Sequence, residues 1–121
     1  MKKVLVVDDD TDVANLMMLF LSGLGYDTDI FLSCEEAVAA LEENSYWAVF
    51  CDYMMPKLAG DKLYRIVKNR DAGLAKRFIV ITGAVLDERL DDFLKSEQVK
   101  VINKPFKLDE IKSILIEFEE L

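Results

Sequence analysis

Carboxylates, a hydroxyl and an ammonium group stand beside short apolar runs of this 121-residue sequence. Asp8 and Asp9 follow one run, Asp52 follows another, Thr82 closes a third and Lys104 comes soon after a fourth. The chain has no His, which removes the commonest general base, the commonest metal-binding side chain and the Ser-His-Asp triad. Any chemistry must therefore come from carboxylates, Lys and hydroxyl groups.

Oxygen ligands without His or thiolate favour a hard divalent cation. If Asp8, Asp9 and Asp52 were held about 5 Å apart, each pair would repel by roughly 3 kcal/mol at an effective dielectric near 20. Mg²⁺ accepts one or two carboxylates and keeps several waters, so it fits such a site better than Zn²⁺. Asp52 could then attack phosphorus, with Mg²⁺, Lys104 and Thr82 neutralising the transferred oxygens. The product would be an aspartyl phosphate.

Apolar runs of five or six residues alternate with amphipathic stretches, a pattern typical of βαβ units. Strands are expected at residues 3–7, 26–31, 47–51, 78–82 and 99–102. Helices are expected at about residues 11–24 and 33–43, and around residues 63–67, 86–94 and 108–118. The strands have few polar positions, which requires helices on both faces of the sheet. The sequence therefore predicts an α/β fold, a (βα)5 doubly wound parallel sheet of five strands.

In doubly wound sheets, ligands bind beyond the carboxyl ends of the strands. All the candidate residues fall at such ends. Each has an ordinary structural explanation on its own, as an acidic helix entry, a strand Thr or a Lys-Pro surface loop. Their coincidence at four strand ends of one sheet favours a functional site.

Composition and charge narrow the class of protein further. Hydrophobic residues make up 52% of the chain and its formal net charge is −8, so a compact domain is expected and direct nucleic-acid binding is not. No apolar run approaches the ~20 residues of a membrane span, and no signal-peptide pattern follows the first Met, so a cytoplasmic protein is expected. Residues 1–121 are expected to form one domain, with any output domain outside this chain.

The sequence resembles the receiver domain of two-component response regulators over essentially its whole length. The motifs are the acidic pair at residues 8–9, Asp52-Tyr53-Met54-Met55-Pro56 with Gly60 behind it, Ile81-Thr82-Gly83, and Lys104-Pro105-Phe106. The resemblance implies a flavodoxin-like sheet with strand order 2-1-3-4-5. It also implies a signalling domain rather than an enzyme, one that promotes its own phosphorylation and dephosphorylation.

The resemblance implies the acceptor and the metal ligands as well. Asp52 would accept a phosphoryl group from the phosphohistidine of a sensor histidine kinase or from a phosphotransfer protein. The cofactor would be Mg²⁺, bound directly by Asp9 and mainly through water by Asp8. Asp52 and the backbone carbonyl of Met54 would complete the metal site.

Further implications concern the phosphoryl group and the partner surface. Thr82 and Lys104 would contact the phosphoryl group, and the Lys104–Pro105 peptide bond would be cis. An output domain or partner protein would bind the face formed by the last two helices and the strand at residues 99–102, without membrane contact.

Three positions depart from the family's usual pattern. Val101 stands where the family has an aromatic residue, so a signal must pass through the loop at residues 82–84 and the helix after it. Met54 and Ala84 occupy positions that tune dephosphorylation in the family, and neither side chain can orient a water. A long-lived phosphoaspartate is therefore expected.

Other readings of the sequence remain open. A degenerate receiver would bind a partner without being phosphorylated. A haloacid-dehalogenase-type phosphatase also uses an Asp nucleophile, although Thr11 comes one residue too early for its motif and 121 residues are few for its core and cap. A flavodoxin-like flavin binder lacks its phosphate-binding loop, because an acidic triplet follows the first strand.

The two cysteines, Cys34 and Cys51, lack metal-binding spacing and are expected to be small apolar residues with free thiols. If the first strand separates the strands that precede them, the thiols would lie near 10 Å apart, beyond disulfide reach. Alternation along the strand directs Cys51 to the face opposite Asp52.

Overall fold

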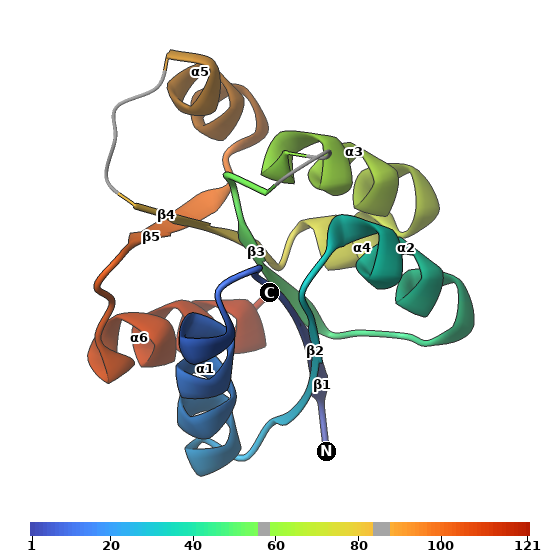
Figure 1. The fold of residues 1–121 in the computed structure, drawn as a ribbon. Helices are drawn as coiled ribbons and strands as arrows, with labels where there is room; N and C mark the ends of the chain where they lie inside the picture. Colours follow the sequence, from blue (N-terminus) through green and yellow to red (C-terminus); the bar gives the residue numbers. More distant parts are fainter. Residues whose placement is uncertain (56–58, 84–87) are drawn as a thin grey trace.

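Strands and helices alternate along residues 1–55, 59–83 and 88–121, which this computed structural model describes. In chain order the elements are β1 (Lys3–Val7), α1 (Thr11–Gly23), β2 (Asp27–Phe31), α2 (Cys34–Glu43), β3 (Ala48–Asp52), α3 (Gly60–Arg70), α4 (Ala72–Ala75), β4 (Phe78–Thr82), α5 (Glu88–Glu97), β5 (Lys100–Asn103) and α6 (Leu108–Glu119). Within this described part, five parallel strands form one sheet in the order β2-β1-β3-β4-β5 (Figure 1). The predicted fold class and strand order are confirmed.

Helices cover both faces of the sheet, as the apolar strands require (Figure 1). On one face, β1 directs Leu5 and Val7 into a cluster formed with α2, α3, α4 and α5. On the other face, Val4 and Val6 pack in a second cluster with α1 and α6. Alternate side chains of β1 thus enter opposite clusters, and all four are fully buried.

Local signals in the sequence set where the first two helices begin. The Asp10 side chain accepts hydrogen bonds from the backbone N–H groups of residues 12 and 13 and caps α1. Ser33 caps α2 by accepting from the Glu36 N–H at 3.2 Å. After α1, Gly25 has φ +91°, a left-handed conformation that favours glycine. These residues fix where α1 begins and ends and where α2 begins.

Some boundaries differ from the expected ones by one residue, and one helix was missed. The third strand includes Asp52 instead of ending before it, and the fifth begins at Lys100. The short helix α4 follows α3 directly, with Asp71 capping it through the Leu74 N–H at 3.1 Å. A single turn is too short to show helical periodicity, so the sequence pattern could not predict it. Leu86, which the sequence assigned to the fourth predicted helix, lies outside the described residues.

The start of α3 packs closely against the end of β3. A Cβ atom at Gly60 would lie 3.1 Å from the Tyr53 Cα and 3.4 Å from the Asp52 carbonyl oxygen. The Gly60 N–H also donates to the Tyr53 carbonyl oxygen at 3.0 Å. Glycine therefore allows α3 to approach the backbone of Asp52, which fixes this carboxyl end of the sheet.

None of the helices in the described residues is both long enough and apolar enough to cross a membrane.

Candidate functional site

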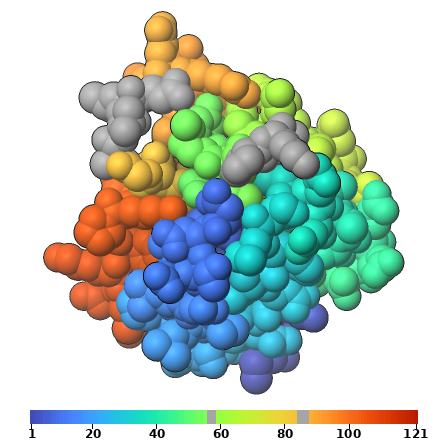
Figure 2. All heavy atoms as spheres, in the orientation of Figure 1, coloured from blue at the N-terminus to red at the C-terminus, as the bar shows by residue number. Residues whose placement is uncertain are grey.

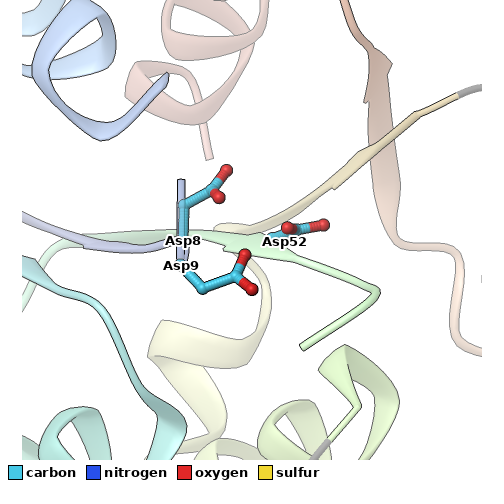
Figure 3. A group of neighbouring side chains, drawn as sticks. All are labelled: Asp8, Asp9 and Asp52. Atoms are coloured by element: carbon cyan, nitrogen blue, oxygen red, sulfur yellow. The ribbon is translucent and has the colours of Figure 1, made fainter. Parts of the chain in front are cut away.

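Three carboxylates gather where β1 and β3 end. Asp8 and Asp9 follow β1, and Asp52 is the last residue of the neighbouring strand β3 (Figure 3). One oxygen from each of the three side chains lies within 4.8 Å of the others. Asp8 is fully buried, Asp52 is nearly so and Asp9 is exposed. The carboxylates thus lie at the separation at which they repel one another and require a countercharge.

Lys104, the residue after β5, supplies one positive charge. Its ammonium lies 3.2 Å from Asp8 Oδ2 and 3.5 Å from Asp52 Oδ2. The backbone helps to place this side chain, because the Lys104 N–H donates to the Thr82 carbonyl oxygen at 2.8 Å. The Lys104–Pro105 peptide bond is cis, as the resemblance implied. Burial lowers the pKa of Lys104, but the charges of Asp52 and Asp8 outweigh burial and raise it above its ordinary value.

The surroundings of Asp52 disfavour the charged form of its carboxylate. Burial and then the nearby Asp8 charge raise its pKa above the ordinary value. Lys104 and the Met54 N–H act in the opposite direction, the latter by donating to Asp52 Oδ1 at 3.2 Å. The net effect is a carboxylate whose charged form would be stabilised by a further cation.

The donor set fits a hard cation. It consists of carboxylate oxygens, and the Asp10 N–H donates to Asp8 Oδ1 at 2.9 Å, which fixes the buried side chain. Asp8 Oδ2 is fully buried, and the Lys104 ammonium is the partner that the described residues provide for it. Oxygen ligands of this kind and an incompletely satisfied anionic oxygen suit Mg²⁺.

The remaining residues singled out from the sequence lie at the same edge with fewer contacts. Thr82 ends β4, is nearly buried and pairs with Asn103 of β5. Met54 is 68% exposed. The carboxyl ends of β1, β3 and β4, coloured blue, green and gold, adjoin on one face of the molecule (Figure 2). Pro56 and Ala84 lie outside the described residues.

The predicted separation of the two cysteines is wrong. Neither cysteine is in a disulfide and both are buried, but the two thiols lie close enough to interact, which lowers the pKa of Cys34 and raises that of Cys51. The estimate of 10 Å assumed that Cys34 extends the line of β2. Instead Cys34 begins α2, which crosses the face of the sheet and packs in the same cluster as Cys51.

A buried ion pair near the site was not foreseen. Asp61, in the first turn of α3, is 2% exposed and accepts two hydrogen bonds from Arg89 of α5, at 3.0 and 3.1 Å. Arg65 lies 3.7 Å from the same carboxylate. An acid after Gly60 is an ordinary first-turn residue of a helix, so only the approach of α5 reveals that it is buried and paired.

Comparison with known proteins identifies the family. The response regulator receiver domain model matches residues 4–116, and the chain belongs to that family. It is 29% identical over 120 residues to the response regulator receiver protein CpdR of Brucella abortus, covering 96% of this chain and 98% of that protein. It is 30% identical over 115 residues to the transcription factor SKN7 of Saccharomyces cerevisiae, covering 95% of this chain but 18% of the factor.

Solved structures agree with this assignment. The Francisella response regulator 1452 receiver domain superposes with a TM-score of 0.83 at 28% identity, covering 99% of this chain and 98% of that one. A CheY-like receiver domain protein from Methanospirillum hungatei superposes with a TM-score of 0.88 at 24% identity, covering 99% and 95% of the two chains, and supports the fold. The protein is thus a signalling receiver domain of the two-component type. Receiver domains bind Mg²⁺ at an acidic pocket and interact with kinases, phosphotransfer proteins and output domains.

Proposed function

We propose that Asp52 accepts a phosphoryl group from a sensor histidine kinase or a phosphotransfer protein in the cytoplasm. Mg²⁺ would be held by Asp8, Asp9, Asp52 and the backbone carbonyl of Met54. One observation supports the proposal above all others, namely the gathering of three carboxylate oxygens within 4.8 Å of one another beside the Lys104 ammonium. This arrangement gathers carboxylates that can bind a cation around the acceptor, and it provides the fixed positive charge of Lys104 for the oxygens of the incoming phosphoryl group.

The reaction would be an in-line displacement at phosphorus. A carboxylate oxygen of Asp52 forms the new O–P bond while the bond from phosphorus to the donor nitrogen breaks, and the donor imidazole leaves with the electron pair. Bound Mg²⁺ would supply positive charge to the phosphoryl oxygens. Lys104 stays close to the acceptor side chain and stabilises the same oxygens, and the Thr82 hydroxyl would donate to one of them. The Met54 N–H, which now donates to Asp52 Oδ1, is placed to hold the acceptor in position.

The partner surface in this proposal is the face of α5, β5 and α6. Val101 of β5 and Ile116 of α6 are 37% and 50% exposed, so apolar surface is available there for an output domain or a partner protein. The net charge of −8 argues against direct contact with nucleic acid. We propose one domain over residues 1–121, with any output domain outside this chain. The chain spans only 18% of SKN7 but 98% of CpdR, so its relatives include both a long protein that contains a receiver and a protein of about the length of one receiver.

Acetyl phosphate and Mg²⁺ provide the direct test. Intact-mass measurement of the wild-type chain should show one added phosphoryl group. Asp52→Asn should show none, and the exposed Asp12→Asn, in the same acidic stretch, should react like the wild type. No mass gain in the wild type would favour a degenerate receiver. Repeated turnover of a phosphate ester would favour the phosphatase reading.

The phosphoaspartate should persist for minutes or longer at neutral pH with Mg²⁺. Met54 is apolar and points largely to solvent, so it cannot hold a hydrolytic water by hydrogen bonding. The decay can be followed by intact mass after removal of acetyl phosphate. Substituting Met54→Asn, which introduces an amide able to bind water, should shorten the lifetime. Decay of the wild type within a few seconds would contradict this expectation.

A further inference from the structure

Three side-chain pairs join α3 to α5, which lie side by side (Figure 1). One pair lies near the start of both helices, one in the middle and one near the end, in the order Asp61–Arg89, Tyr64–Phe93 and Lys68–Glu97. On each helix these residues are three or four positions apart, so they share one helical face. The two ion pairs differ in burial, because Asp61 is buried whereas Lys68 is exposed.

The buried pair at the start of the two helices has a well-defined geometry. Taking a carboxylate out of water costs free energy that a partner must compensate. Arg89 does so with two hydrogen bonds, in which Nε–H donates to Asp61 Oδ2 at 3.0 Å and Nη2–H donates to Oδ1 at 3.1 Å. Such a two-donor contact fixes orientation as well as distance. A carboxylate in a first turn stabilises a helix even when it is exposed, so α3 does not require this burial.

The start of α3 is fixed by contacts from outside the helix. Side chains cap α1 and α2, but the N-cap residue of α3 is Ala59, which has no hydrogen-bonding side chain. The Gly60 N–H donates instead to the Tyr53 carbonyl oxygen at 3.0 Å. Asp61, the next residue, is fixed by Arg89. One contact with the end of β3 and one with α5 thus position the first turn of α3.

Gly60 connects this first turn to the acceptor. The glycine lies so close to β3 that a Cβ atom on it would be 3.1 Å from the Tyr53 Cα and 3.4 Å from the Asp52 carbonyl oxygen. Backbones packed this closely leave little room for independent movement. Asp61 follows Gly60 directly, so a displacement of Asp61 would shift the backbone that carries the Asp52 carboxylate.

We propose that Asp61 and Arg89 are positioning residues for the phosphorylation of Asp52, an inference that rests on the proposed function. Neither belongs to the carboxylate cluster at residues 8, 9 and 52. They act through Gly60, by holding the start of α3 against the end of β3. Phosphoryl transfer requires the acceptor to be aligned with the phosphorus and its leaving group, and small displacements lower the rate strongly. Loss of the pair should therefore slow phosphorylation about tenfold.

The first test measures the initial rate of phosphorylation by acetyl phosphate at saturating Mg²⁺, per folded molecule as judged by circular dichroism. Arg89→Ala should react about tenfold more slowly than the wild type. Lys68→Ala is the matched control and should react like the wild type, because it removes the exposed ion pair at the other end of the same helix contact. Arg89→Lys keeps the charge without the two-donor geometry and should react at an intermediate rate.

A double variant, Asp61→Leu with Arg89→Ala, separates positioning from stability. Replacing the buried carboxylate by an apolar side chain should recover part of the stability that Arg89→Ala loses. The phosphorylation rate should stay low, because Leu cannot form the two hydrogen bonds that fix the first turn of α3. A rate that rises in step with the stability would show a merely structural role and overturn the inference.

Hydrogen exchange provides a readout that does not depend on phosphorylation. The Gly60 amide should exchange faster in Arg89→Ala than in the wild type or Lys68→Ala, as NMR of the folded proteins would show. A wild-type phosphorylation rate or unchanged Gly60 exchange in Arg89→Ala would each overturn the inference. If Arg89→Ala does not fold, Arg89→Lys and the double variant decide the result. A wild type that gains no phosphoryl group would count against the proposed function, while Gly60 exchange would still decide whether the ion pair holds the backbone beside Asp52.

Discussion

Replacing Asp8 by Asn should stabilise the protein without metal and remove its response to Mg²⁺. Asp8 has Asp9 and Asp52 within 4.8 Å, so each repulsion amounts to at least about 3.5 kcal/mol at an effective dielectric near 20. The Lys104 ammonium at 3.2 Å attracts Asp8 by about 5 kcal/mol on the same scale. Asp9 and Lys104 are partly screened by solvent, which reduces both effects.

The balance is a net repulsion of about 1–2 kcal/mol that Asn would relieve. A neutral amide is also cheaper to bury than a carboxylate at a site with no solvent exposure. Asp8→Asn should therefore raise the free energy of unfolding in EDTA by about 1–2 kcal/mol, or the melting temperature by roughly 3–8 °C.

Urea unfolding with EDTA and with millimolar MgCl₂ measures both effects. The wild type should be more stable with Mg²⁺, because the ion binds the folded state, and Asp8→Asn should show little of this gain. The exposed Asp12→Asn is the control and should keep the response to Mg²⁺. An Asp8→Asn protein less stable than the wild type in EDTA would refute the reasoning, because it would mean that the attraction to Lys104 exceeds the repulsion within the cluster.

Three further outcomes are expected. Without metal, Asp52→Asn should be more stable than the wild type at pH 7, and this difference in stability should shrink in acid. The reason is that the raised pKa of Asp52 reflects a free-energy cost of its charged form in the folded protein, and this cost disappears as pH falls through that pKa. Urea midpoints of both proteins from pH 4 to 7 measure the difference. Arg89→Ala should cost about 1–3 kcal/mol in urea unfolding, because among the described residues it leaves Arg65, at 3.7 Å, as the cation next to the buried Asp61. Adding Asp61→Leu should recover part of the loss, and an unchanged midpoint for Arg89→Ala would contradict a structural role for the pair. Trp47 emission should change little on Mg²⁺ addition, since Trp47 precedes β3 and lies roughly 16 Å along the strand from Asp52, and strong quenching would contradict this register.

The apolar runs are sufficient to predict the strands of the sheet and the helices that cover its two faces. Strands such as Phe78–Thr82, buried throughout, can exist only with helices on both sides, and this requirement alone predicts the layers. The caps at Asp10 and Ser33 and the turn at Gly25 are equally local, because each depends on hydrogen bonds or dihedral angles within a few residues. The one-turn helix α4 was missed because its four residues carry no period.

The sequence also placed the acids at strand ends, but it could not show which of them is buried, which is exposed and which caps a helix. In the triplet at residues 8–10, Asp8 is buried in the cluster, Asp9 is exposed at its edge and Asp10 caps α1. Which of these environments each carboxylate enters depends on where the chain turns from β1 into α1 and on the arrival of Lys104 from β5.

Contacts between distant elements were decided by the tertiary structure alone. The thiols of Cys34 and Cys51 come close because α2 packs on the face of the sheet, and the pairing of Asp61 with Arg89 arises because α5 packs against α3. Neither contact has a periodic or spacing signal, since the sequence separation of two side chains says nothing about the angle at which their helices pack. The sequence determined which reactive groups the chain has, and tertiary packing determined which of the other side chains lie next to one another.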